Sequence, residues 1–133
     1  MTMIYNTKPA EIDLSCIEGD VIDMEFFINS QLNTLSQKEF FVSLGSAPST
    51  GTAFTMSNLK MQVRRKDYLL IKDWLSGVSP SDMVITNPGE FHLFDDSGFL
   101  ESGHFDYELQ CNNGLGYFTI MKGQWQVKKQ ITV

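Results

Sequence analysis

A chain of 133 residues is long enough for one domain with its own hydrophobic core, and short for two. Its formal net charge is −6, with 16 acidic and 10 basic residues. Such a chain repels a phosphate backbone, so we expect no nucleic-acid partner. The sequence has no run of about 18 apolar residues and no signal peptide at its start, so we expect no membrane association and synthesis in a reducing cytoplasm.

The first part of the chain is predicted to form an arm followed by two strands. Residues 1–11 lack an apolar row and contain Pro9, which predicts a flexible N-terminal arm. Apolar and polar residues alternate over 12–17 and again over 22–28, which predicts two strands because successive strand side chains point to opposite faces. The polar residues 29–37 predict a connection that holds at most one helical turn.

The middle of the chain reads as short strands separated by turns. Phe40, Val42 and Leu44 predict one strand. Residues 45–53 are small and uncharged, which predicts an exposed, mobile loop. Alternation and turn residues then predict further strands at 59–63, 68–77, 83–86 and 90–94.

The clearest pattern lies at the C-terminal end. Residues 103–111 alternate strictly between polar and apolar, Asn113-Gly114 suits a tight turn, and residues 117–122 can fold back as the second limb of a hairpin. Gly123 predicts a break, after which residues 125–133 form a third strand. The core face is predicted to combine residues of this hairpin and of the early strand: Phe105, Tyr107, Trp125, Ile22, Met24 and Phe26.

Eight to ten short strands, frequent turns and no amphipathic helix predict an all-β, antiparallel β-sandwich in a single domain. The two cysteines, Cys16 and Cys111, fall in apolar rows without the close spacing of a zinc site, so we expect free, slowly reacting thiols.

No motif for catalysis is present. His104, Asp106 and Glu108 would project from one strand face and could hold a metal, but no fourth ligand is indicated, so we interpret them as a solvated polar face. No serine lies in a nucleophile elbow and neither cysteine has a nucleophile motif. We therefore expect a protein that is not an enzyme and carries no cofactor or metal.

Several short motifs resemble a known family. Residues 101–107 fit the frame that opens a late strand in immunoglobulin-type sandwiches, although Phe105 lacks the hydroxyl of the tyrosine corner and Tyr107 stands at the cysteine position. Together with Asp106-Tyr107-x-Leu109-Gln110 and Gly123-x-Trp125, this resembles the immunoglobulin-like domain of bacteriophage baseplate upper proteins, which recurs in other phage tail and head-fibre proteins. The resemblance runs from about Ile12 to Val133.

The resemblance implies an immunoglobulin-like β-sandwich over residues 12–133, with an inserted segment at about residues 30–54. It implies a non-enzymatic structural protein of a bacteriophage virion, made in the host cytoplasm. Such an adaptor or decoration subunit docks on capsid, head fibre or tail and baseplate proteins, and is oligomeric in the assembled particle. Head and tail locations both remain open.

The alternative from another class is a carbohydrate-binding β-sandwich, with Trp74, Trp125 and Tyr68 as stacking platforms. Trp125 shares an apolar row and is expected in the core, whereas Trp74 lies beside Asp73 and is expected to be exposed. For docking, we expect the arm and the loop at 45–53 to make the contacts, because neither is needed for the core. The candidate partner contacts are Met3, Ile4, Tyr5, Ser49, Thr50 and Trp74.

Overall fold

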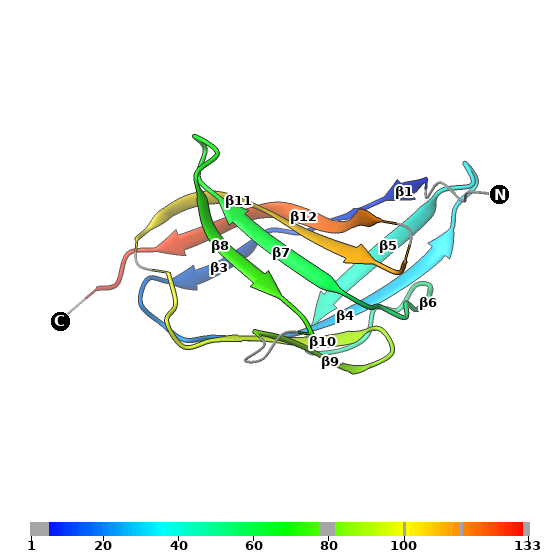
Figure 1. The fold of residues 1–133 in the computed structure, drawn as a ribbon, viewed down its shortest axis with the longest axis horizontal. Helices are drawn as coiled ribbons and strands as arrows, with labels where there is room; N and C mark the ends of the chain where they lie inside the picture. Colours follow the sequence, from blue (N-terminus) through cyan, green and yellow to red (C-terminus); the bar gives the residue numbers. More distant parts are fainter. Residues whose placement is uncertain (1–5, 78–81, 100, 115, 132–133) are drawn as a thin grey trace.

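The computed structural model describes residues 6–77, 82–99, 101–114 and 116–131. Two six-stranded β-sheets face each other around one hydrophobic core (Figure 1). The predicted all-β sandwich is therefore confirmed. Among the described residues there is no helix long and apolar enough to cross a bilayer.

The first sheet has the order β1-β5-β4-β10-β9, and β6 pairs with the second half of β4. Its strands are β1 (Thr7–Lys8), β4 (Ile22–Leu32), β5 (Lys38–Leu44), β6 (Thr52–Ala53), β9 (Met83–Asn87) and β10 (Glu90–Asp95).

The second sheet has the order β2-β12-β11-β7-β8, and β3 also pairs with β12. Its strands are β2 (Ala10–Glu11), β3 (Leu14–Ile17), β7 (Leu59–Arg64), β8 (Leu70–Leu75), β11 (Gly103–Asn112) and β12 (Tyr117–Lys128).

The N-terminal segment differs from the expected arm. β1 pairs with β5 in the first sheet, and β2 and β3 pair with β12 in the second, so residues 7–17 cross from one sheet to the other. All three pairings are parallel, which makes both sheets mixed and not purely antiparallel. Residues 7–8 and 10–11 therefore have strand partners, while residues 1–5 lie outside the described part of the chain.

The predicted break at Gly123 is wrong, because β12 continues without interruption to Lys128. Gly123 lies opposite Tyr107 in the β11–β12 ladder. A Cβ atom on Gly123 would lie 2.2 Å from the carbonyl oxygen of Ile12. The glycine thus makes room for the backbone that passes from β2 to β3, and the Tyr107 hydroxyl donates a hydrogen bond to the same Ile12 carbonyl.

β4 is longer than expected. It runs on to Leu32 through residues that were predicted as a connection, and only a tight turn separates it from β5. In that turn the Asn33 side-chain oxygen accepts bonds from the backbone N–H groups of Leu35 (2.9 Å) and Gln37 (3.0 Å). A side chain that closes its own turn in this way replaces the missing ladder bonds.

Aromatic side chains fill the centre of the core. Trp125 packs against Phe99, Tyr107 and Trp74, with ring centroids 5.2, 5.9 and 5.5 Å away. Phe105 stacks on Phe99 at 5.6 Å. The predicted core residues are buried, except Met24, which is half-buried at the edge of the core.

One ion pair lies at the edge of this core. The Asp95 carboxylate accepts bonds from Lys72 Nζ (2.9 Å), from Trp74 Nε1 (2.9 Å) and from Ser97. Burial alone would raise the pKa of Asp95, but the bonds from Ser97, Trp74 and Lys72 together hold that pKa well below its ordinary value. This carboxylate therefore joins β8 to β10 across the two sheets.

Candidate interaction surface

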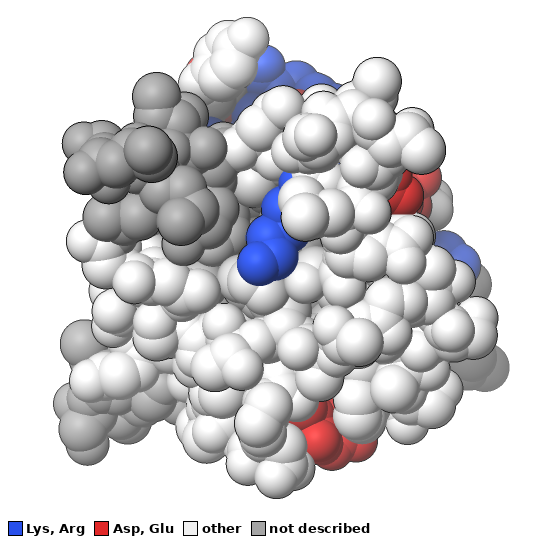
Figure 2. Space-filling view, turned by 90° about the vertical axis from the view of Figure 1, so that its right-hand side faces the viewer, with Lys and Arg blue, Asp and Glu red and all other residues white. Residues whose placement is uncertain are grey.

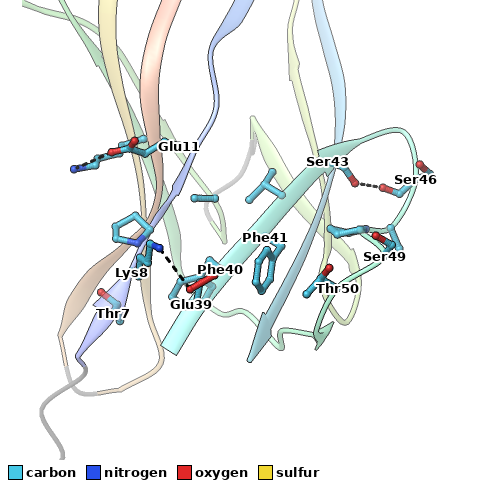
Figure 3. Close-up of a pocket in the computed structure, with 16 residues that line it drawn as sticks. Thr7, Lys8, Glu11, Glu39, Phe40, Phe41, Ser43, Ser46, Ser49 and Thr50 are labelled. Atoms are coloured by element: carbon cyan, nitrogen blue, oxygen red, sulfur yellow. Dashed lines mark hydrogen bonds and ion pairs between the residues drawn. The ribbon is translucent and has the colours of Figure 1, made fainter. Parts of the chain in front are cut away.

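A hollow of about 990 Å³ opens beside β5. Its floor is residues 39–43 of β5, one wall is residues 7–11, and the other wall is the loop at residues 46–50 (Figure 3). The two segments that the sequence singled out for docking therefore lie on either side of one hollow, since residues 7–11 belong to the predicted arm. We call this hollow the β5 hollow.

The loop wall is held in place from below by Asn29 of β4. Its buried side-chain amide donates to the carbonyl oxygens of Pro48 (3.1 Å) and Thr50 (3.1 Å), with a longer bond to Gly51 (3.4 Å). Gly51 has a φ of +80°, and a Cβ there would lie 2.9 Å from the backbone oxygen of Ser30. A loop without apolar anchors is thus fixed by one amide and one close backbone contact.

The charged side chains of the hollow lie on and beside the opposite wall, and each of the two from that wall is paired with one from β5 or β12. Lys8 Nζ lies 3.7 Å from a carboxylate oxygen of Glu39, and Lys122 Nζ lies 3.8 Å from one of Glu11. Three of the four groups are exposed and Glu39 is partly exposed, and both separations are long, so each pair contributes little stability. The two lysines and two glutamates give the hollow a net side-chain charge of zero.

The end of the sandwich next to the hollow has few charged side chains. Residues 26–37, 40–59 and 109–121 contain no Asp, Glu, Lys or Arg. These three stretches meet where Phe40 and Phe118, from different sheets, stack with centroids 6.2 Å apart. Figure 2 shows this end, where charged groups are sparse. Depletion of charge is the compositional mark of the centre of a protein–protein interface.

Among the described residues of these uncharged stretches, four large apolar side chains are exposed. Leu32 is 75% exposed and Leu35 in the following turn is similarly exposed, while Leu44 at the end of β5 and Tyr117 at the start of β12 are each about half exposed. Lys60 Nζ lies 4.3 Å from the centre of the Tyr117 ring. Exposed apolar side chains on an uncharged background favour contact with another protein.

Comparisons with protein-family models, with curated proteins and with solved structures found no match to this chain.

The structure places the predicted contact residues differently. Ser49 and Thr50 are exposed on the loop wall of the β5 hollow. Trp74 is only 2% exposed and packs in the core, so its predicted role as a surface contact is wrong. Its neighbour in the register is the buried Met61 of β7, which shows that Trp74 faces inward. Three further predicted contacts lie outside the described residues: Met3, Ile4 and Tyr5.

The polar row of β11 makes surface contacts with its neighbours. Asp106 pairs with Lys66 at 2.7 Å, and Glu108 accepts bonds from Gln110 and Thr119. Among the residues that the structure describes, no three His, Cys, Asp or Glu side chains gather closely enough to hold a metal ion. The row serves as a polar strand face in this structure.

Both cysteines are free thiols. Burial raises the pKa of Cys16, and a bond from the Trp125 indole partly offsets that effect. Burial also raises the pKa of Cys111. A raised pKa lowers the thiolate fraction, so neither thiol has the environment of a nucleophile.

Sequence reasoning missed two features of the hollow. One is Asn29, which directly follows the apolar residues Phe26 to Ile28 and precedes further polar residues, so the sequence marks it only as the start of a polar connection. The other is the exposed edge of β5, which depends on the partners of that strand and has no local signal in the sequence.

Proposed function

We propose that this protein is a non-enzymatic structural protein of a bacteriophage virion, an immunoglobulin-like adaptor or decoration subunit that docks on capsid, fibre or tail proteins. The observation that carries the docking role is the β5 hollow. It brings together the N-terminal segment and the loop that the sequence selects for docking, at an end of the sandwich that is depleted of charge. The assignment to a phage particle rests on the motif resemblance.

The strand order supports the immunoglobulin-like part of the proposal. With β5 and β6 set aside, the first sheet reads β1-β4-β10-β9 and the second reads β12-β11-β7-β8. In this reduced form the order would match A-B-E-D and G-F-C-C′ of immunoglobulin-type sandwiches, with β5 standing between the first two strands. β5, the loop after it and β6 would then be an insertion between the second and third strands, within the expected segment at 30–54.

The insertion is also what makes the hollow. β5 supplies its floor and the loop at 46–50 supplies one wall. An immunoglobulin-type sandwich without these residues would have β4 next to the N-terminal strand. The proposal therefore assigns the docking role to the part of the chain that the common sandwich lacks.

Quantitative mass spectrometry of purified particles tests this proposal. The double variant Ser49→Arg/Thr50→Arg places two charges on the exposed loop wall, and Ser15→Arg places one on exposed β3 as a matched control. We expect wild type and control to be incorporated equally. The double variant should fall by about tenfold or more, because burying an unpaired charge costs more than about 1.4 kcal/mol. A protein absent from purified particles would refute the virion role, and full incorporation of the double variant would refute docking through the hollow.

The carbohydrate-binding alternative has lost most of its support. Trp74 and Trp125 are both buried in the core. Of the three expected platforms only Tyr68 is exposed, on the turn between β7 and β8, and a single ring is a poor stacking site.

A further inference from the structure

The strand β5 has an edge that is only partly covered. On one side it pairs with β4 along its whole length, from Lys38 to Leu44. On the other side β1 pairs with it only at Lys38 and Glu39. The chain then passes through Pro9 to the second sheet, so in the described part of the chain no strand pairs with residues 40–44 on this side.

The hydrogen-bonding pattern between β4 and β5 shows which backbone groups of β5 point toward its uncovered side. Asn33 N–H donates to Gln37 O at 2.9 Å, and Gly45 N–H donates to Glu25 O at 3.0 Å. Hydrogen-bonded pairs alternate along an antiparallel ladder, so the odd-numbered residues of β5 exchange bonds with β4. The even-numbered ones point the other way, and Lys38 N–H accordingly donates to Asn6 O at 2.8 Å.

Beyond β1, the N–H and C=O groups of Val42 and Leu44 therefore point toward the β5 hollow. Among the residues that the structure describes, no strand pairs with these two on that side, and none forms a backbone bond to them outside the strands. Peptide groups on an open edge are a template for a further strand.

This edge lacks the features that usually protect a free strand edge. Natural proteins guard such edges with charged residues, proline or bulges. Residues 40–44 read Phe-Phe-Val-Ser-Leu, with no charge and no proline, and their ladder with β4 has no register shift. Strongly β-forming, uncharged residues on an open edge are hazardous unless something covers them.

The chemistry of the walls restricts what can cover the edge. The four charged side chains of the hollow are already matched as Lys8–Glu39 and Glu11–Lys122. A charged side chain on a bound segment would be buried in the hollow without an ion-pair partner, and such burial costs free energy. The two walls also leave a wedge beside β5, open between the N-terminal segment and the loop (Figure 3). A single extended segment suits this wedge better than the edge of a folded sheet.

We propose that the edge of β5 at residues 40–44 is a strand-acceptor site, which takes an extended, uncharged segment of a partner protein into the β5 hollow. This deepens the docking role proposed above and rests on it. The Val42 and Leu44 backbone groups bind the segment by ladder bonds, in a hollow whose lining includes Phe41 and Ala10. A second copy of this chain is a poorer occupant, because each copy carries a net charge of −6 and its own walls around β5.

The test uses a capped heptapeptide of alternating Thr and Val as the probe, with ¹⁵N-labelled protein observed by NMR. We expect the amide signals of Val42 and Leu44 to shift on titration and their hydrogen exchange to slow. The same peptide N-methylated at every residue keeps its side chains but loses the backbone donors of both strand edges. It should bind at least about tenfold more weakly, because two or more hydrogen bonds are lost.

Two variants at one position complete the test. Val42→Pro removes the outward N–H, which an edge strand tolerates, while the bonds of Phe41 and Ser43 to β4 remain. Val42→Thr keeps the N–H and serves as the control. We expect Val42→Pro to weaken probe binding by about tenfold and Val42→Thr to leave it nearly unchanged. Equal binding of the methylated probe, shifts confined to other strands, or no binding at millimolar probe would overturn the proposal. A concentration-dependent dimer that protects the β5 amides would also overturn it, in favour of a second copy.

Incorporation into particles separates this inference from the function on which it rests. If Val42→Pro abolishes probe binding but is incorporated normally, the strand-acceptor site is not the docking site, and the virion role stands. If wild-type protein is absent from particles yet binds the probe at β5, the virion role fails and the acceptor site stands.

Discussion

Replacing Asp95 with asparagine is expected to lower the free energy of unfolding by about 3 kcal/mol at neutral pH. The Asp95 side chain is 11% exposed and that of its partner Lys72 is 17% exposed. Removing one member of a buried ion pair costs about 3–5 kcal/mol, because it leaves a buried charge without compensation. Asparagine keeps one oxygen that can accept from Trp74 or Lys72, which places the cost at the lower end of that range.

The cost should depend on pH in a defined direction. The pKa of Asp95 is held below its ordinary value in the folded state, so the unfolded state binds the proton more readily. The stability that Asp95 contributes is therefore fully present above the unfolded pKa of about 3.9, and it is lost as the pH falls below that value toward the lower folded pKa. The difference between wild type and Asp95→Asn should shrink as the pH falls from 5 to below 3.

Urea denaturation at a series of pH values measures this difference. In urea the m-value should stay unchanged. In a thermal melt at pH 7, the melting temperature of the variant should be lower by about 10 °C for a domain of this size. Asp96→Asn is the matched control, because Asp96 is the exposed neighbour in the same turn, and its effect should stay within about 0.5 kcal/mol. A variant that differs from wild type by under about 1 kcal/mol at pH 7, with no dependence on pH, would show that the Lys72–Asp95–Trp74 contacts contribute little.

Three further changes address the core, the N-terminal crossing and the thiols. Phe105→Ala should cost about 3–5 kcal/mol in chemical denaturation, because Phe105 is buried against Phe99, and an unchanged melting temperature would contradict this. Gly123→Ala should cost about 1–3 kcal/mol in the same assay, because the added methyl group meets the Ile12 carbonyl; a neutral effect would mean that the N-terminal segment shifts freely. Cys16 and Cys111 should react slowly with a thiol reagent at pH 7.5 in the folded state and rapidly in urea, and rapid labelling of the folded protein would contradict the raised pKa values.

The sequence predicts strands well where a row of side chains faces one core. The row from Phe105 to Cys111 alternates throughout, the row from Ile22 to Ile28 alternates except at Phe27, and both lie where expected. In such rows, local pattern and tertiary burial impose the same period of two.

The sequence-based predictions failed for residues whose burial or pairing depends on which strand lies beside them. Trp74 follows a register shift opposite Val63 and Arg64, which moves the inward face of β8 off the simple alternation. β1 and β2 pair in parallel with strands far away in the chain, and a two-residue strand has no period to detect. The β5 hollow depends on such pairings: the sequence predicted the strand at its floor and selected the arm and the loop for docking, but it gave no signal that the three lie together around a partly open edge.

The crossing of residues 7–17 between the sheets has a consequence for synthesis on the ribosome. Leu14 pairs with Trp125, roughly 110 residues later in the chain. At typical rates of translation, β3 must wait on the order of 5–20 s for its partner to appear. β1 can pair with β5 well before that. The N-terminal segment would then be bound to the first sheet alone until the hairpin β11–β12 of the second sheet is complete. A nascent chain arrested before β12 should therefore carry an open second layer, and prove far more sensitive to protease than the released protein.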